Sequence, residues 1–411
     1  MKIYLVGGAV RDSLLGYPYT EKDYVVTGAT RQQMLDLGYE QVGKDFPVFL
    51  HPKSKEEYAL ARLERKKGKG YYGFEVDFSP DVTLEEDLKR RDLTINAMAM
   101  DEQGNLIDPY GGQADLEAKL IRHVSNAFIE DPVRVLRVAR FIARYYHMGF
   151  RLADETRILM AQMTRSGELE NLVPERVWQE CERALSENNP EQFFVTLRQI
   201  GALAIIFPEL DKLFGVPNKV TYHPEIDSGI HSLYSLQACT TKTNNSCMRF
   251  AALVHDLGKA ETQMSDWPSH PGHDEAGEPI IRQLCKRLKI PNDYQSFALL
   301  VCRFHLLIHR VDKLSSDEIL FVLNHADAFR RSHRFEQLLV VSEADINGTG
   351  RKMPFPQGDK WRYLLSECAK VQAQDVIKQG FKDQQIKLEL DARRLACIDI
   401  IQKMWKENEK K

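Results

Sequence analysis

The segment Leu5–Gly28 reads LVGGAVRDSLLGYPYTEKDYVVTG and carries several structural signals in one short stretch. An apolar run that ends at Val6 predicts a strand, the residues from Val10 to Leu15 predict a short helix, and a glycine pair separates the two. After a turn at Gly16–Pro18, a second apolar run predicts another strand. A strand, a helix and a strand at the start of the chain indicate an α/β domain.

Several residues of this segment suit the binding of a phosphate group and a metal ion. The N–H groups of a helix that follows Gly7 and Gly8 are free to bind phosphate, and Arg11 adds a charge-assisted donor. Glu21 and Asp23 stand two apart at the expected start of the second strand, so both side chains project from one face. Two carboxylates beside a phosphate site can hold a divalent metal for phosphoryl transfer. A tight turn and a solvated strand face are the ordinary alternatives, but the combination favours a nucleotide site.

The order GGAVRD, then a strand with two carboxylates, resembles the head domain of the nucleotidyltransferase superfamily, in particular bacterial class II CCA-adding enzymes and their poly(A) polymerase relatives. The family's metal motif is Asp-x-Asp, whereas this chain has Glu21-Lys22-Asp23, one methylene longer at the first ligand. The resemblance implies that Glu21 and Asp23 are the catalytic carboxylates that hold Mg²⁺, and that Gly8 and Arg11 bind the nucleotide.

Composition limits the classes of protein that this chain can belong to. Its 411 residues predict two to four domains, and its net charge of −3 provides no overall basic field, so a nucleic acid would have to bind local patches. No apolar run approaches the length that spans a membrane, and the first residues suit a strand better than a signal peptide. The seven cysteines are scattered without a CxxC pair, which indicates free thiols in a reducing cytoplasm.

The pattern of apolar residues changes near residue 130. Before it, strands are expected at 2–6, 23–27, 46–51, 57–63, 73–78 and 104–107, and helices at 10–15, 30–38 and 92–99. After it, helical periodicity continues to the end of the chain. The predicted fold class is therefore α+β, a mixed-sheet head followed by an elongated all-α neck and body.

Two features of the head have more than one interpretation. The loop Arg62–Tyr72 carries five basic residues, and it is either a solvated hairpin tip or a flap that reaches toward RNA or triphosphate. Glu57 lies where a third carboxylate could approach the metal, but Ala59 and Ala61 share its face of the strand. We therefore expect no third ligand there.

A second head motif follows at KRRDLTINA, which begins at Lys89. Asp92 suits the N-cap of a helix that carries Ile95 and Met98 inward. An acid–base run on a surface turn is the ordinary alternative. The motif resembles one in the head of the same family, and the resemblance implies that Arg91 reaches the nucleotide or braces the site.

A row of arginines follows Asp131, which is the expected N-cap of a long helix. At about 100° per residue, Arg134, Arg137, Arg140 and Arg144 fall within one arc of about 120°, opposite the apolar side chains. A helix with one buried and one solvated face would explain this periodicity. Such a helix would not explain why the four arginines have no acidic partners one turn away. A row of unpaired arginines indicates a basic surface that binds anions.

The sequence EDPVR that opens this helix resembles the family's base-reading motif. The resemblance implies that Asp131 and Arg134 select CTP and ATP by imitating a Watson–Crick edge, and that Arg137 and Arg140 contact the phosphates or the sugar. A carboxylate accepts a hydrogen bond from the exocyclic amine that cytosine and adenine both carry. An enzyme that selects bases in this way needs no template strand.

Histidines cluster between residues 223 and 309, at positions 223, 231, 255, 270, 273, 305 and 309. Their centre is an apolar run that ends in His255-Asp256, followed by Leu-Gly-Lys. A lone buried histidine is usually a satisfied core residue. This spacing, with His231 before and His305 after, supplies mixed nitrogen and oxygen ligands for a transition metal or Mg²⁺.

The HDLGK sequence resembles the HD superfamily of metal-dependent phosphohydrolases. One subgroup of bacterial CCA enzymes carries such a domain, with 2′,3′-cyclic phosphodiesterase, 2′-nucleotidase and phosphatase activities. The resemblance implies a divalent transition metal, with Ni²⁺ as a candidate, held by His231, His255, Asp256 and His305. Similar sequences read His-Asp where this chain has His305-Leu306, so either Asp345 replaces the missing carboxylate or hydrolysis is weakened.

These features together predict a cytoplasmic enzyme that adds C, C and A to tRNA from CTP and ATP, with a fused HD phosphohydrolase. It would be a monomer or a homodimer without membrane contact. The alternatives are a poly(A) polymerase of the same superfamily, an HD hydrolase whose head has decayed into an RNA-binding module, and a non-enzymatic RNA chaperone. The expected domains are a nucleotidyltransferase head at 1–130, a helical neck at 131–222, an HD domain at 223–330 and a helical tail at 331–411, whose tRNA-contacting residues stay open.

Overall fold

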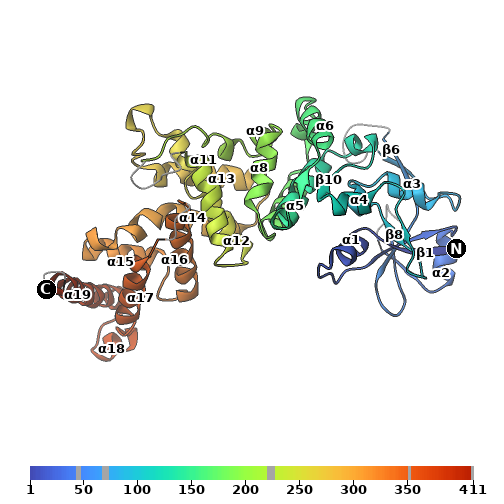
Figure 1. The fold of residues 1–411 in the computed structure, drawn as a ribbon. Coiled ribbons are helices and arrows are strands. Elements are labelled where there is room, and N and C mark those ends of the chain that lie inside the picture. Colours follow the sequence, from blue (N-terminus) through green and yellow to red (C-terminus); the bar gives the residue numbers. More distant parts are fainter. Residues whose placement is uncertain (43–47, 67–73, 220–226, 350–352, 409–411) are drawn as a thin grey trace. The chain divides into compact units, whose positions relative to one another are not determined.

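The computed structural model describes residues 1–42, 48–66, 74–219, 227–349 and 353–408. The chain divides into two compact units, an N-terminal unit (Met1–Ile206) and a C-terminal unit (Phe207–Lys411). In Figure 1 the strands belong to the blue and teal part of the chain, and the part from yellow to red is helical. Each unit is therefore built on its own core.

A seven-stranded mixed sheet forms the centre of the N-terminal unit, in the order β3-β4-β5-β2-β1-β8-β9. Its strands are β1 (Lys2–Val6), β2 (Asp23–Thr27), β3 (Glu40–Val42), β4 (Val48–Leu50), β5 (Glu57–Leu60), β8 (Ala99–Met100) and β9 (Leu106–Ile107). β1 runs antiparallel to β2 and β8, whereas β2 and β5 are parallel. The β-branched and aromatic residues of the two central strands, β1 and β2, suit this position.

Alternation along β2 gives the sheet two different faces. Val25 packs with Val6, Leu88 and Ala97 on one side, and Val26 packs in the other core cluster, which contains Met34, Phe49 and Tyr58. Successive side chains of a strand point to opposite faces, so Asp23 shares the face of Val25. That face also carries Leu88, three residues before Arg91 in the chain.

Short helices cover the sheet: α1 (Gly8–Leu15), α2 (Arg31–Asp36), α3 (Leu84–Lys89) and α4 (Gly112–Glu117). The predicted helix at 92–99 is wrong. The helix lies earlier, at α3, where Thr83 and Glu86 form a capping box. Residues 94–96 make one 3₁₀ turn, because the chain must then enter β8 and pair with β1.

Two other details of the strands matter for the site. β2 has the expected bounds and begins at Asp23, opposite Val6 of β1, so Glu21 lies in the loop before the strand and not on its face. The predicted strand at 57–63 is two strands, β5 and β6 (Leu63–Lys66), of which β6 pairs with β7 (Phe74–Asp77). Most of the loop Arg62–Tyr72 lies outside the described residues, so its two interpretations stay open.

The rest of the N-terminal unit is mostly helical, with α5 (Val133–Tyr145), α6 (Asp154–Arg165), α7 (Pro174–Leu185), α8 (Glu191–Gln199) and α9 (Leu203–Ile206). A short parallel pair joins β10 (Leu120–Ile121), which precedes α5 in the chain, to β11 (Arg151–Leu152), which follows it. The predicted N-cap at Asp131 is wrong by one residue, because Pro132 is the N-cap of α5. Asp131 precedes it, and its Oδ1 accepts a hydrogen bond from Val133 N at 3.1 Å. α5 packs against α7 and α8.

The C-terminal unit is helical throughout its described part. Its helices are α10 (Pro208–Asp211), α11 (Ser228–Thr240), α12 (Ser246–Val254), α13 (His273–Arg287), α14 (Asn292–His309), α15 (Ser316–His325), α16 (Ser332–Asn347), α17 (Pro356–Cys368), α18 (Ala373–Lys378) and α19 (Gln384–Asn408). The central helices α11, α12, α13, α14 and α16 pack against one another. None of the helices in the described ranges is both long and apolar enough to cross a bilayer.

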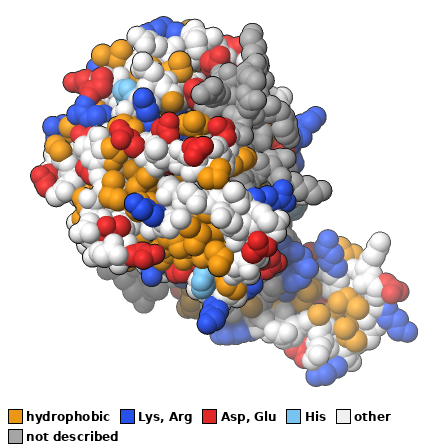
Figure 2. Space-filling view, turned by 90° about the vertical axis from the view of Figure 1, so that its right-hand side faces the viewer, with side chains coloured by type: hydrophobic (Ala, Val, Ile, Leu, Met, Phe, Trp, Pro, Cys, Tyr) orange, Lys and Arg blue, Asp and Glu red, His pale blue; other side chains and the backbone are white. Residues whose placement is uncertain are grey.

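Charged side chains of both signs are interspersed with apolar ones on the face that Figure 2 shows. This mixture agrees with the small net charge of the chain. Charge that serves a function must therefore be sought in local groups.

Candidate nucleotide site and buried metal centre

The turn between β1 and α1 gathers three of the predicted nucleotide-binding residues. Gly7 has a φ of 69°, which favours glycine, and a Cβ there would lie 3.0 Å from Arg91 Nη1. Gly8 begins α1, and a Cβ on it would lie 3.5 Å from Arg11 Nη2. The backbone and both guanidinium groups therefore lie together at the start of the helix.

Asn96 links these two arginines, although the sequence analysis gave it no role. Its side-chain oxygen accepts from Arg11 Nη1, and its backbone oxygen accepts from Arg91 Nη1 at 3.5 Å. Arg11 also donates to both oxygens of Asp12, at 2.8 and 3.0 Å. Asn96 is a polar residue between Ile95 and Ala97 in the KRRDLTINA motif, and this position was the available signal.

The carboxylates lie at the same end of the sheet as this turn. In the sheet, Asp23 of β2 pairs with Val6 of β1 on one side and with Glu57 of β5 on the other. The predicted metal ligands, Glu21 and Asp23, are both exposed. Partial desolvation raises the pKa of Asp23, Arg91 lowers it and Glu21 raises it, so the charges of all three residues interact. The oxygen donors suit Mg²⁺, although the described part of the head contains no group of three acidic ligand atoms within 4.8 Å of one another.

The arginines of α5 have acidic partners, so the prediction of an unpaired basic surface on this helix is wrong. Arg137 Nε donates to Asp92 Oδ2 at 2.7 Å, and Arg140 Nε donates to Glu180 Oε2 at 2.7 Å. Arg144 Nη2 donates to Asp12 Oδ2 at 3.2 Å. The acidic partners come from distant parts of the chain, so spacing within the helix could not reveal them.

The two predicted base-reading residues have separate partners. Asp131 forms a bidentate ion pair with Arg176 of α7, at 2.8 and 3.3 Å. Arg134 is buried and donates to the backbone oxygens of Ala127 and Arg90, each at 2.7 Å. Arg176 was missed, although it shares one face of α7 with Glu180, four residues on, as helical spacing would have shown.

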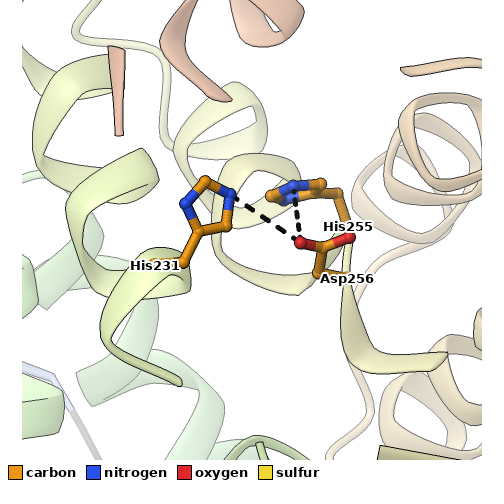
Figure 3. Close-up of side chains that lie close together, drawn as sticks. All are labelled: His231, His255 and Asp256. Carbon is orange, nitrogen blue, oxygen red and sulfur yellow. Dashed lines mark ion pairs between the residues drawn. The ribbon is translucent and has the colours of Figure 1, made fainter. Parts of the chain in front are cut away.

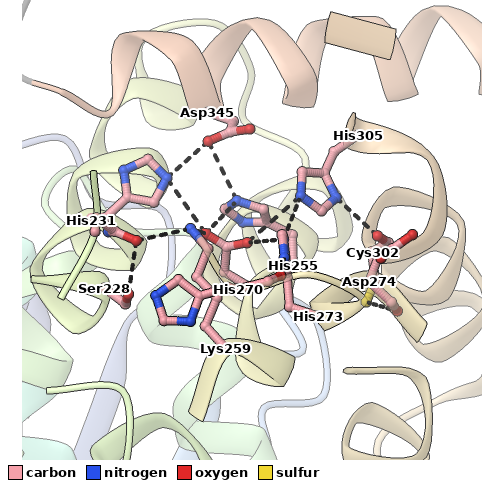
Figure 4. A network of polar contacts seen from close by, with 12 residues as sticks. Ser228, His231, His255, Lys259, His270, His273, Asp274, Cys302, His305 and Asp345 are labelled. Atoms are coloured by element: carbon pink, nitrogen blue, oxygen red, sulfur yellow. Dashed lines mark hydrogen bonds and ion pairs between the residues drawn. The ribbon is translucent and has the colours of Figure 1, made fainter. Parts of the chain in front are cut away.

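A second polar cluster lies inside the C-terminal unit. Five helices or their ends contribute to it: His231 comes from α11, His255-Asp256 from the end of α12, His273 from the start of α13, His305 from α14 and Asp345 from α16. All six side chains are buried. Figure 3 shows His231 and His255 turned toward Asp256, and Figure 4 shows the wider network.

Asp256 is the centre of this cluster. Burial alone would raise its pKa, but His255 and Lys259 outweigh this effect and hold the pKa well below its usual value. Lys259 Nζ lies 2.6 Å from Asp256 Oδ2. Burial also lowers the pKa of His305 to about 3, which leaves a neutral imidazole, the form that binds metals.

Asp345 joins the cluster, as one of the two sequence-based alternatives proposed. One of its oxygens lies 2.8 Å from His231 Nε2 and 3.4 Å from His255 Nε2, and the other lies 2.7 Å from His309 Nε2. The carboxylate that is missing beside His305 is thus present from another helix, beyond the expected end of the domain at residue 330.

The remaining histidines have other surroundings. His270 Nε2 lies 2.7 Å from the backbone oxygen of Pro217, and its Nδ1 lies 2.7 Å from Thr262 Oγ1, so this ring serves the local structure. His223 lies outside the described residues.

The donor set fits a divalent metal ion. Three groups have ligand atoms within 4.8 Å of one another: His231, His255 and Asp256; His255, His305 and Asp345; Asp256, His273 and His305. Among the described residues, the buried atoms His255 Nε2 and Asp256 Oδ1 make no hydrogen bond. Buried polar atoms normally have partners, so these two are suited to coordinate an ion.

Comparisons with known proteins agree with both parts of this description. Family models match residues 3–122 (poly A polymerase head domain), 149–214 (probable RNA and SrmB-binding site of polymerase A) and 229–332 (HD domain). A crystal structure of the Bacillus stearothermophilus CCA-adding enzyme in complex with CTP has a TM-score of 0.65 at 24% identity, covering 99% of this chain and 93% of that one. The Thermotoga maritima CCA-adding enzyme complexed with tRNA_CCA has a TM-score of 0.62 at 20% identity, covering 97% and 87%.

Sequence relatives are closer than these structures. The multifunctional CCA protein of Legionella pneumophila (strain Paris) is 58% identical over 410 residues, which is 100% of both chains. An identity of this size over the whole length leaves no segment of the chain unmatched. The chain belongs to the family of multifunctional CCA proteins.

Proposed function

We propose that this protein adds C, C and A to the 3′ end of tRNA, using CTP and ATP, and that it also hydrolyses phosphate esters at the buried HD cluster. The observation that carries the first activity is the convergence of Gly8, Arg11 and Arg91 at the end of the sheet where Asp23 lies. The CTP and tRNA complexes of CCA-adding enzymes with this fold support the choice of substrates.

In the head, Glu21 and Asp23 would hold Mg²⁺, which supplies positive charge for nucleotidyl transfer when bound. The N–H groups at the start of α1, with Arg11 and Arg91, bind and orient the triphosphate. Asp12 and Asn96 hold Arg11 in place for this task. Pyrophosphate leaves as the tRNA 3′-hydroxyl attacks the α-phosphate.

Base selection is assigned to Asp131 and Arg134, with Arg137 and Arg140 contacting the phosphates or the sugar. The ion pair between Asp131 and Arg176 holds the acceptor oxygens of Asp131 in a fixed orientation. A cytosine or adenine amine can share that carboxylate, because each oxygen has two lone pairs.

At the HD cluster, a divalent transition metal such as Ni²⁺ would be held by His231, His255, Asp256 and His305, joined by Asp345. The substrates are 2′,3′-cyclic phosphodiesters and phosphomonoesters. We further propose a cytoplasmic location, which the free state of all seven cysteines supports, and functional domains at 1–130, 131–222, 223–330 and 331–411.

The first test is extension of a tRNA that lacks its CCA end, with Mg²⁺ and each nucleoside triphosphate separately, then with CTP and ATP together. We expect growth by C, C and A followed by a stop. Unlimited addition of A would identify a poly(A) polymerase, and no extension would leave the HD cluster as the only active site. Asp23→Asn is the matched inactive control.

The second test is hydrolysis of a 2′,3′-cyclic nucleotide by the full chain with Ni²⁺ or Mg²⁺. We expect activity with the transition metal, lost in Asp256→Asn and retained in Asp23→Asn. Loss in both variants would contradict two separate sites.

A further inference from the structure

Asp87 of α3 is a fully buried carboxylate beside Arg91, one of the predicted nucleotide-binding residues. Its side chain has 0% exposure, and its Oδ2 accepts a hydrogen bond from Arg91 Nη2 at 3.2 Å. Burial alone would raise the pKa of Asp87, but Arg91 and Arg90 outweigh burial and lower it, so the carboxylate is ionised. A buried charge is costly unless it is paired. The fold thus holds this charge in place against two arginines.

Asp87 and a backbone oxygen orient the guanidinium group of Arg91. Nη2 donates to Asp87, and Nη1 donates to the backbone oxygen of Asn96 at 3.5 Å, a long hydrogen bond. Nε is buried and makes no hydrogen bond to any residue that the structure describes. A Cβ on Gly7 would lie 3.0 Å from Nη1, so the group stands beside the turn that opens α1. The charged contact with Asp87 is the stronger of the two.

The groups that bind the two oxygens of Asp87 are hydrogen-bond donors. Oδ1 accepts from Arg90 Nη2 at 2.6 Å, from Arg90 Nε at 3.1 Å and from the backbone N–H of Arg62 at 3.3 Å, whereas Oδ2 accepts from Arg91. An asparagine has the same shape but carries an oxygen on one side and an NH₂ group on the other. It keeps the larger number of bonds when its oxygen takes the Oδ1 position. Its NH₂ group then faces Arg91 Nη2, donor against donor, so Asp87→Asn displaces Arg91.

We propose that Asp87 is a positioning residue for nucleotide binding, which acts by holding Arg91 toward the triphosphate. This inference rests on the proposed nucleotidyl transfer and adds a residue to its site. Asp87 can act only through its neighbours, because its own side chain is closed off from solvent. A guanidinium group that is already oriented loses less conformational entropy on binding a phosphate than a mobile one does. Loss of Asp87 therefore weakens nucleotide binding and changes the chemical step little.

The test is a double-mutant cycle on Asp87 and Arg91, with KM for CTP and kcat measured for CMP addition to a tRNA that lacks its CCA end. Asp87→Asn should raise KM about fivefold to tenfold and leave kcat within about twofold. Arg91→Met should raise KM at least as much. In the Arg91→Met background, Asp87→Asn should cause no further change, because the residue through which Asp87 acts is absent. Additive effects of the two substitutions would overturn the proposal.

Asp115→Asn is the matched control. Asp115 is also a buried carboxylate of the head, at 7% exposure, but it binds Arg122 and Thr94 instead of a predicted nucleotide-binding residue. Asp115→Asn should lower the thermal stability, as Asp87→Asn does, and leave KM for CTP unchanged. An equal rise of KM in both variants would show that the loss of any buried carboxylate in the head has this effect, which would contradict the role of Asp87.

A second measurement needs no variant of Asp87. By nuclear magnetic resonance of the wild type with ¹⁵N-labelled arginine, the guanidinium signals of Arg91 are identified by their absence from Arg91→Met. The ion pair at Nη2 hinders rotation of the group, so the two Nη atoms should give separate resonances, and one averaged resonance would overturn the proposal.

The outcomes separate this inference from the proposed function. A wild type that adds no nucleotide to tRNA refutes the proposed function, and the resonances of Arg91 still decide whether Asp87 holds it. Addition of C, C and A by the wild type, together with additive effects in the cycle, refutes only the role of Asp87.

Discussion

Asp92 and Arg137 form an ion pair with 2.7 Å between Oδ2 and Nε, although 45 residues separate them in the chain. The other oxygen of Asp92 accepts from Asn96 Nδ2 at 3.0 Å, and the Asn96 side chain binds Arg11. A continuous chain of contacts therefore joins helix α5 to the start of α1. The predicted nucleotide-binding residues Arg11 and Arg137 are held by one network, in which Arg11, Asp92 and Asn96 are buried and Arg137 is partly exposed.

Asp92 is expected to make stability depend on pH. Burial raises its pKa, but Arg137 and Asn96 outweigh burial and hold it far below the usual value. The folded-state pKa is thus lower than the unfolded one, so the stabilisation is complete above about pH 4 and is lost as the pH falls below it. We expect Asp92→Asn to lower the free energy of unfolding by about 1 to 3 kcal/mol at neutral pH.

Urea unfolding of both proteins at neutral pH and near pH 3 checks this prediction. The difference between wild type and variant should shrink in acid. A difference that stays constant over this range would show that the Asp92 charge does not contribute.

Variants of Glu21 test whether the longer side chain of the first predicted metal ligand impairs nucleotidyl transfer by the head. It lies in the loop before β2, where the backbone can compensate for one methylene, so Glu21→Asp should change the rate of CMP incorporation less than about tenfold. Glu21→Gln removes a metal-binding charge and should slow incorporation on the order of 100-fold, which corresponds to about 3 kcal/mol. A large gain in Glu21→Asp would instead support the decayed-head alternative.

Tyr145 is expected to position the nucleotide-binding arginine indirectly. Its hydroxyl donates to Asp12 Oδ1 at 2.6 Å, and Asp12 binds Arg11. Losing that hydrogen bond in Tyr145→Phe should cost about 1 kcal/mol, seen as a roughly fivefold higher KM for CTP and ATP with a similar kcat. Tyr146→Phe, at the exposed neighbouring residue, is the control. Equal KM values in the wild type, Tyr145→Phe and Tyr146→Phe would show that Tyr145 does not position Arg11.

Gly258 is expected to be essential for the packing that places His273. A Cβ on it would lie 1.9 Å from the backbone oxygen of His273 and 2.6 Å from Gly277 N, and neither backbone atom can move freely. Gly258→Ala should destabilise the C-terminal unit by about 1 to 3 kcal/mol and weaken Ni²⁺ binding about tenfold or more. Thermal unfolding and dialysis against Ni²⁺ measure both effects, and unchanged values would contradict the close contact.

Local signals in the sequence determined much of the head and the identity of both sites. The strand at 2–6 and the helix behind Gly7 were predictable, because each depends on side chains a few residues apart. The two motif sets, from GGAVRD to EDPVR and around HDLGK, indicated a nucleotide site and a metal site.

Only the tertiary structure decided how the charged residues are used. The arginine row of α5 looked unpaired because Asp92, Glu180 and Asp12 reach it from other elements. Asp345 lies 89 residues beyond Asp256 in the numbering and joins its cluster only because α16 packs against α11 and α12. Burial then makes such pairs strong and specific, since a buried charge without a partner is costly, and no local pattern records which distant residue supplies that partner.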